Sequence, residues 1–238
     1  ACAAVCGAGG GGEVVGVGGR PLCAVVVWGV AFLVLTVAGG RLELSRGLRP
    51  TPRIIGLFTA AAGVFLGGVL LSVWAYDAGV RLAGLGLVLL AAWLLRYDLA
   101  RRNVRLSGLT RFIAVCLFGG YVWLAAGGLL WLVYGGVMAG PIYDAVLHAV
   151  FLGFVFAMIF GHAPLIFPSV LGRPMAYLPV FYGPLIVLHL SLLVRTAGDL
   201  FNVVPLRQWG GLLNGVALLL FLGLTALGLA RGAPARTR

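Results

Sequence analysis

Long apolar stretches dominate this chain, and short polar or charged segments separate them. A helix that crosses a membrane needs about 20 largely apolar residues. Seven stretches meet this requirement, near residues 22–40, 54–76, 80–96, 111–138, 143–162, 177–197 and 210–230. The pattern therefore predicts an all-α fold, a polytopic transmembrane helical bundle of about seven spans.

The spans are expected to form one transmembrane domain over residues 20–238, without a separate soluble domain. Residues 1–19 are nearly all Gly, Ala, Val and Cys, and we expect little order there. The tight turn AYDAGVR predicts that the second and third spans form an antiparallel hairpin. Gly63 and Gly67 make a small-xxx-small step on the second span, which predicts a close helix approach at that point.

The composition supports this fold and excludes several other classes of protein. The 238 residues are 62% hydrophobic and 10% charged, with a mean hydropathy of +1.10. A water-soluble surface, an intrinsically disordered chain and a nucleic-acid-binding domain do not fit these values. The four cysteines (Cys2, Cys6, Cys23, Cys116) are too scattered for a disulfide framework, and Cys116 is expected to be a buried, inert thiol.

The positive charge is distributed unevenly between the two sides of the predicted membrane. The net charge is +11, and all 17 basic residues are arginines. Seven spans place 13 of them on one side, namely Arg41, Arg46, Arg49, Arg53, Arg96, Arg101, Arg102, Arg105, Arg111, Arg173, Arg231, Arg236 and Arg238. Because basic loops stay inside, we expect the N-terminus outside and the C-terminus in the cytoplasm of a prokaryotic cell, with the protein in its inner membrane. We interpret the basic loops as topology determinants that contact anionic lipids. The lipid bilayer is therefore the expected partner, and nucleic acid is not.

All three histidines of the chain, His148, His162 and His189, fall within 42 residues. On a regular helix, His148 and His162 share one face and lie about 21 Å apart along the axis. His189, on the sixth span, lies roughly 18 Å from the start of that span, at the expected depth of His148. Two imidazoles at one depth on neighbouring helices fit a bis-His haem, and equally two ligands of a copper or zinc site.

A structural role is the alternative, in which each histidine forms a hydrogen bond at a helix interface. Ionisable residues within membrane spans are costly and usually mark functional sites, so we favour a haem or metal role for the histidines. His148 and His189 are then the expected ligands, with His162 a weaker third metal candidate. Arg195, at the outer end of the sixth span, is expected to pair with haem propionates or with Asp199 four residues further on.

Prolines mark two further features near the histidines. Pro179 and Pro184 are expected to interrupt the sixth span and to free backbone carbonyls near His189. Residues 163–177 contain three prolines and are expected to form a short interfacial segment on the cytoplasmic side.

The run HAVFLGFVFAMIFGHAPLIFPSVLGRP, with the later HLSLLVR, resembles the histidine-bearing helices of the NnrS-like membrane proteins. More loosely, it resembles subunit I of the haem-copper oxidases. The resemblance covers residues 144–195 and implies binding of b-type haem, with copper possible, and a link to nitric-oxide stress. On that match His148 and His189 are haem or metal ligands and His162 is a weaker third. This chain has fewer spans and fewer histidines than that family, so we do not expect it to reduce oxygen or nitric oxide by itself.

Three functions follow from these features. The first is a haem- or metal-binding membrane protein that acts in electron transfer or in nitric-oxide- or oxygen-related sensing or defence. The second is a non-catalytic subunit or assembly factor of a respiratory membrane complex, which implies a redox or respiratory partner. The third is a small transporter with a histidine relay, against which we count the aspartates, since all four appear at span ends rather than buried within the bundle.

Overall fold

The computed structural model describes residues 22–45, 50–172 and 174–232. Within these ranges, seven helical segments are long and apolar enough to cross a membrane, and no strand occurs. The prediction of an all-α bundle with seven spans is therefore confirmed. The tail predicted over residues 1–19 lies outside the described residues.

The helix boundaries extend most of the predicted spans by a few residues. The first four spans are α2 (Leu22–Ser45), α3 (Pro52–Leu71), α4 (Tyr76–Tyr97) and α6 (Gly108–Tyr134), with the short α5 (Ala100–Asn103) before α6. The fifth span joins α7 (Pro141–Leu147), the π-helix η3 (His148–Phe156) and α8 (Ala157–Leu171). The 3-10 turn η4 (Pro179–Phe181) and α9 (Tyr182–Leu200) form the sixth span, and α10 (Val204–Arg231) forms the seventh.

The prolines act differently from the expectation. Pro164 and Pro168 lie inside α8, which continues to Leu171, so the predicted interfacial segment is mostly helix. Transmembrane helices tolerate proline where neighbouring helices and local adjustments satisfy the freed backbone groups. Pro179 and Pro184 lie in the first turns of η4 and α9, where a proline costs no intrahelical hydrogen bond. They begin the sixth span and do not interrupt it.

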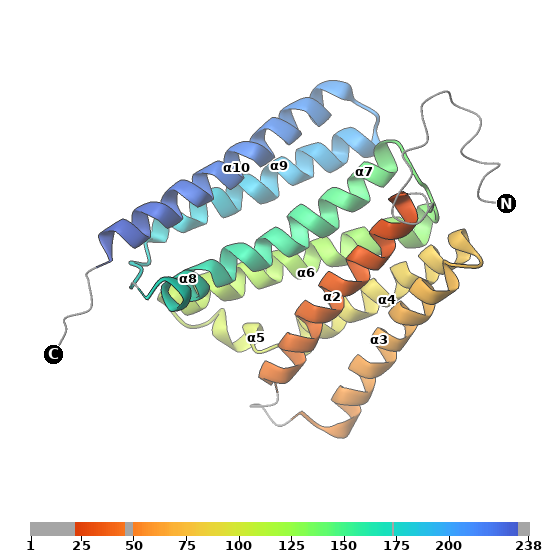
Figure 1. Cartoon of the computed structure of the whole chain (residues 1–238), viewed down its shortest axis with the longest axis horizontal. Coiled ribbons are helices and arrows are strands. Elements are labelled where there is room, and N and C mark those ends of the chain that lie inside the picture. Colours follow the sequence, from red (N-terminus) through yellow and green to blue (C-terminus); the bar gives the residue numbers. More distant parts are fainter. Residues whose placement is uncertain (1–21, 46–49, 173, 233–238) are drawn as a thin grey trace.

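Helix α6 joins the two halves of the bundle (Figure 1). On one side it packs against α4, which pairs with α3, and α2 lies across both α3 and α4. On its other side it packs against η3 and α8, while α9 and α10 run side by side along the far edge. Each half has its own buried apolar cluster, and residues of α6 such as Leu117 and Phe112 contribute to one or the other.

Glycines allow the close approach of α3 and α4, although not the two glycines that the sequence suggested. A Cβ on Gly68 would lie 2.2 Å from the backbone nitrogen of Ala83, and one on Gly79 would lie 2.2 Å from that of Ser72. Gly63 and Gly67 have no heavy atom of another segment within 4 Å of such a Cβ. The antiparallel hairpin itself is confirmed, and its turn lies at residues 72–75, just before α4.

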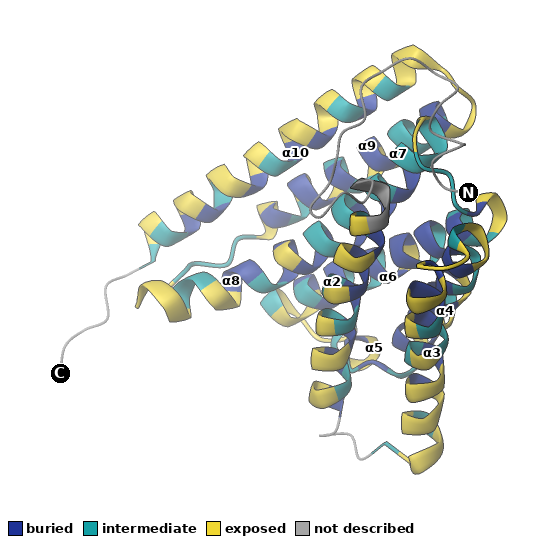
Figure 2. Ribbon diagram, turned by 45° about the vertical axis from the view of Figure 1, so that its right-hand side comes forward, coloured by how far each residue is buried: buried dark blue, intermediate teal, exposed yellow. Residues whose placement is uncertain are grey.

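Apolar side chains cover the outside of the bundle as well as its core. Figure 2 shows exposed residues along the outer faces of α3, α8 and α10, with buried residues turned toward the neighbouring helices. Phe32 and Leu219 are about 70% exposed, at 71% and 70%. Such an exterior is stable only in a hydrocarbon solvent, so the lipid bilayer is the environment that this fold fits.

A buried ion pair ties α2 to the end of α4. Arg41 donates to both carboxylate oxygens of Asp98, at 3.0 Å from Nε and 2.9 Å from Nη2. The hydroxyl of Tyr121 on α6 donates to the same carboxylate. Asp98 is only 2% exposed and Arg41 6%. The sequence placed Asp98 at a span end, but the structure shows that it is also buried, which a carboxylate tolerates because a bidentate arginine compensates its charge.

Candidate metal centre

His148 stands at the first position of a nine-residue π-helix in the middle of the fifth span. A π-helical turn closes i→i+5 hydrogen bonds and holds more residues than an α-helical turn. The expectation that His148 and His162 share one helix face about 21 Å apart assumed a regular α-helix. The π-helix η3 lies between them, so this expectation does not apply. Stretches of π-helix inside α-helices occur frequently at functional sites, because they redirect the side chains that they carry.

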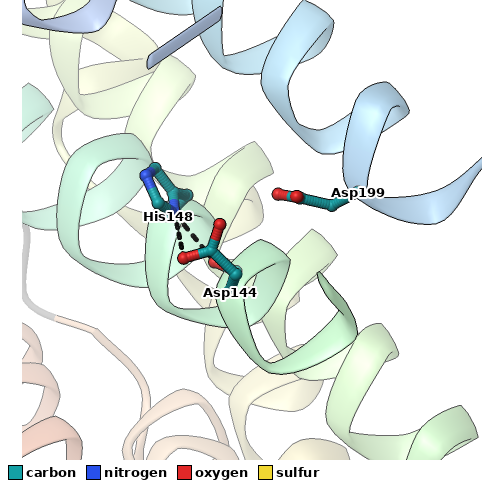
Figure 3. Close-up of side chains that lie close together, drawn as sticks. All are labelled: Asp144, His148 and Asp199. Atoms are coloured by element: carbon teal, nitrogen blue, oxygen red, sulfur yellow. Dashed lines mark hydrogen bonds and ion pairs between the residues drawn. The ribbon is translucent and has the colours of Figure 1, made fainter. Parts of the chain in front are cut away.

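Three potential metal ligands meet where the fifth span begins and the sixth span ends. Asp144 and His148 come from the fifth span and Asp199 from the sixth, and one ligand atom of each lies within 4.8 Å of the others. Figure 3 shows Asp144 and His148 one turn apart on the same helix, with the Asp199 carboxylate reaching toward them from α9. Asp144 and His148 are half-buried and Asp199 is buried.

The His148 ring is held by its own helix. Its Nδ1 lies 2.8 Å from the backbone oxygen of Asp144 and 3.4 Å from the Asp144 carboxylate. Because both neighbours are acceptors, this nitrogen carries a hydrogen in the arrangement described, and Nε2 of the neutral ring keeps its lone pair. Nδ1 is also the ring nitrogen on the side of the Asp144 carboxylate (Figure 3), so a metal ion held by both groups would replace the hydrogen on Nδ1.

Two arginines compensate the charges of the two aspartates. Arg195 forms an ion pair with Asp144, and its Nε lies 3.4 Å from Asp199. Arg207, at the start of α10, places its Nε 2.9 Å from the other oxygen of Asp199. The pairing of Arg195 with Asp199, one of the two roles expected for it, is therefore present, and Asp144 is an additional partner that the sequence did not suggest.

Asp199 keeps unused acceptor capacity despite these charges. Its side chain is fully buried, and none of the described residues donates a well-directed hydrogen bond to either of its carboxylate oxygens. A buried carboxylate with free lone pairs is costly unless something further satisfies it. A metal ion bound by Asp199, Asp144 and His148 would do so.

His189 lies elsewhere on α9. It precedes Asp199 by ten residues, which is about 15 Å along a helix, whereas His148 lies beside Asp199. Trp123 on α6 donates its indole hydrogen to Nδ1 of His189 at 3.0 Å. Since indole nitrogen can only donate, the neutral ring carries its hydrogen on Nε2.

The free side of His189 is closely packed. Its Nε2 is buried without a partner among the described residues, and a Cβ on Gly119 would lie 2.4 Å from it. This packing leaves no width for a flat macrocycle at Nε2. In the arrangement described, His148 and His189 lie at different levels of the bundle, and their pairing on one haem stays a prediction from the sequence.

His162, the weaker third candidate, lies on α8 toward the opposite end of the fifth span. Its Nδ1 is 2.7 Å from the backbone oxygen of Met158, the same local contact that His148 makes. It belongs to none of the three-ligand groups found among the described residues. Cys116 is buried and free, as expected.

The model of one protein family, Domain of unknown function (DUF8744), matches residues 1–230. The chain belongs to this family. No curated protein and no solved structure matches it. The description of the DUF8744 family carries no function, and the likeness to NnrS-like proteins stays a prediction.

The sequence pointed to His148 and Arg195 but not to Asp144 and Asp199 as candidate ligands. A local signal was present, since Asp144 and His148 are four residues apart and therefore neighbours on one helical face. Asp199 stands in the same relation to Arg195 on the next span. Only the packing of α9 against α7 shows that these two pairs adjoin.

Proposed function

We propose that this protein is an integral membrane protein that binds one divalent transition-metal ion through Asp144, His148 and Asp199. The observation that supports this proposal most directly is the convergence of three ligand groups within 4.8 Å of one another. One imidazole and two carboxylates suit zinc and also copper, and three protein ligands leave an open position for water or a substrate.

Metal binding requires the arginines to give way. In the arrangement described, Arg195 and Arg207 balance the charges of Asp144 and Asp199. An incoming dication replaces these contacts, so its affinity is the difference between ligation and the loss of the three arginine–aspartate ion pairs. Copper at this position gives the protein a role in electron transfer or in nitric-oxide- or oxygen-related sensing or defence, in line with the sequence resemblance, and implies a redox partner in the membrane.

The test is metal titration of the purified protein after treatment with a chelator. We expect about one Zn²⁺ or Cu²⁺ per chain by elemental analysis, and a visible absorption band when Co²⁺ replaces zinc. His148→Ala should abolish binding. The matched control is His162→Ala, because His162 lies on the same span with the same backbone contact. Equal loss in both variants, or no binding by the unmodified protein, refutes the proposal.

The same sample tests haem. An absorption spectrum of the oxidised and reduced protein shows a Soret band if b-type haem is bound, and His148→Ala or His189→Ala then converts it to a high-spin spectrum or loses the haem. Metal without a Soret band supports the carboxylate–histidine centre. A Soret band that survives in His148→Ala but not in His162→Ala places the haem at the other end of the fifth span.

A proton relay is the second candidate, and the burial of Asp199 favours it. The position of the aspartates at span ends was counted against a transport role. In the structure, however, Asp199 is only 1% exposed and lies between two arginines beside His148. Chains of Asp and His within membranes serve as proton relays in transporters. Metal-free protein in which Asp199→Asn abolishes proton uptake into proteoliposomes supports this role.

We further propose that the centre faces the outside of a prokaryotic inner membrane. The described arginines at the ends of α2, α4 and α10 lie at the opposite end of the bundle, and basic segments stay in the cytoplasm. Reporter fusions after Arg111 and Arg238 should both report the cytoplasm. A periplasmic signal at Arg238 refutes this orientation.

A further inference from the structure

A cavity of about 700 Å³ lies at the end of the bundle opposite the candidate metal centre. The end of α2, the start of α3 and the segment from the end of α4 through α5 form its walls, all on the side where α6 begins (Figure 1). Four arginines line it: Arg96, Arg101, Arg102 and Arg105. The cavity is open on one side and combines a hollow of this size with a concentration of positive charge.

Asp98 is the one acidic side chain among the described residues of the lining, and it does not neutralise these arginines. The carboxylate of Asp98 accepts two hydrogen bonds from Arg41 and one from the hydroxyl of Tyr121, so Arg41 already compensates its charge. None of the described residues forms an ion pair with Arg101, Arg102 or Arg105, and all three are exposed. Their guanidinium groups are thus available to a ligand.

The start of α3 adds to the positive potential. Thr51, which precedes this 20-residue helix, has an extended backbone (φ −65°, ψ 155°), and its side chain does not cap the helix. The helix dipole is positive at this end, and none of the described residues accepts a hydrogen bond from the Thr51 hydroxyl. A helix N-terminus and several arginines around one cavity are the combination that binds phosphate groups.

We propose that this cavity binds the phosphate group of an anionic ligand, with a phospholipid headgroup as the source that its position favours. Planar guanidinium groups match phosphate oxygens in pairs, which a diffuse positive surface cannot do. The cavity lies at the ends of membrane spans, where headgroups lie, and exposed apolar residues of the same spans, Leu44 and Leu57, would contact the acyl chains.

Calorimetric titration of the protein in an uncharged detergent tests this site. The probes are dioctanoyl phosphatidylglycerol, zwitterionic dioctanoyl phosphatidylcholine and inorganic phosphate. The variant Arg101→Gln/Arg102→Gln removes two charges from the cavity. The matched control Arg111→Gln/Arg231→Gln removes two exposed charges from the same end of the bundle but outside the cavity.

We expect saturable binding of phosphatidylglycerol that weakens about tenfold or more in the cavity variant. The control variant should change it by less than about twofold, since exposed charges at a distance are screened by salt. Arg105→Gln gives an independent second variant, and thermal unfolding shows that each variant is folded.

The phosphate arm distinguishes the two sources. If inorganic phosphate binds only weakly, the acyl chains or the glycerol contribute and the ligand is a lipid. If phosphate binds as tightly and competes with phosphatidylglycerol, the cavity recognises a soluble phosphorylated compound by the same chemistry. Equal weakening in the cavity and control variants, equal binding of phosphatidylcholine, or no binding of either anionic probe overturns the proposal.

Discussion

Replacement of Asp98 by asparagine tests how much the buried ion pair between α2 and α4 stabilises the bundle. In the protein, Arg41 and Asp98 have side-chain exposures of 8% and 1%. The substitution keeps the size of the side chain and one acceptor oxygen, but it removes the charge that Arg41 faces. An arginine without a counter-ion then remains in the interior.

The expected loss follows from this burial. Removal of one partner of a buried ion pair costs about 3–5 kcal/mol, because the other charge stays desolvated and uncompensated. Asparagine retains one acceptor for Tyr121 and Arg41, so we expect about 3 kcal/mol. The double variant Arg41→Met/Asp98→Asn should lose less than the sum of the two single variants, by about 1 kcal/mol or more.

An exposed ion pair in the same protein provides the control. Arg81 and Asp77 form an i,i+4 pair at 2.8 Å with side-chain exposures of 42% and 64%. Exposed pairs contribute about 0–1 kcal/mol. In Asp77→Asn the amide oxygen can still accept the Gly136 N–H that Asp77 accepts at 2.9 Å, so we expect a loss of less than about 1 kcal/mol.

The free energy of unfolding of each variant is measured by denaturant titration in mixed micelles, with helical circular dichroism as the signal. The reasoning is refuted if Asp98→Asn and Asp77→Asn lower this free energy by the same amount. It is also refuted if the double variant is as unstable as the sum of its single variants, because Arg41 and Asp98 would then not act as a pair.

Two further predictions concern packing. Gly68→Ala should lower the free energy of unfolding by about 1–3 kcal/mol, because the added Cβ would meet the backbone of α4. Gly67→Ala, where the added Cβ meets open space, should be neutral or slightly stabilising. Equal effects of the two substitutions on thermal unfolding would contradict the close approach of α3 and α4. Trp123→Phe should cost about 0.6–1.7 kcal/mol and change the ¹⁵N shifts of the His189 ring, since it removes the donor to Nδ1, while Trp74→Phe at an exposed position (79%) should do neither.

The sequence by itself determined the fold class and the number of spans. A membrane-spanning helix must satisfy its backbone hydrogen bonds within itself and match the bilayer thickness. One continuous apolar stretch of about 20 residues therefore indicates both that the segment is a helix and how long it is. The buried state of Cys116 followed in the same way from its place within such a stretch. These are local properties, and no contact between distant residues is needed to infer them.

The sequence was less informative about which face of a helix meets its neighbour. Gly63 and Gly67 have the spacing of a packing motif, yet Gly68 makes the close contact with α4. Both faces of these spans are apolar, one toward protein and one toward lipid, so hydrophobicity does not distinguish them. The prolines were misjudged for a related reason, because their effect depends on their position relative to helix ends that hydropathy locates only within a few residues.

Only the tertiary structure decided the composition of the candidate centre. Counting residues from the predicted span ends paired His148 with His189, and this count assumed regular α-helices with known starting points. His148 lies near the start of the fifth span, and the sixth span continues to Leu200, so that Asp199 near its end, and not His189 ten residues earlier, lies beside His148. Which side chains meet across two helices depends on the rotation of each helix about its axis and on the shift of one helix along the other. Packing between the helices sets both quantities, and neither can be derived from the residues of one helix alone.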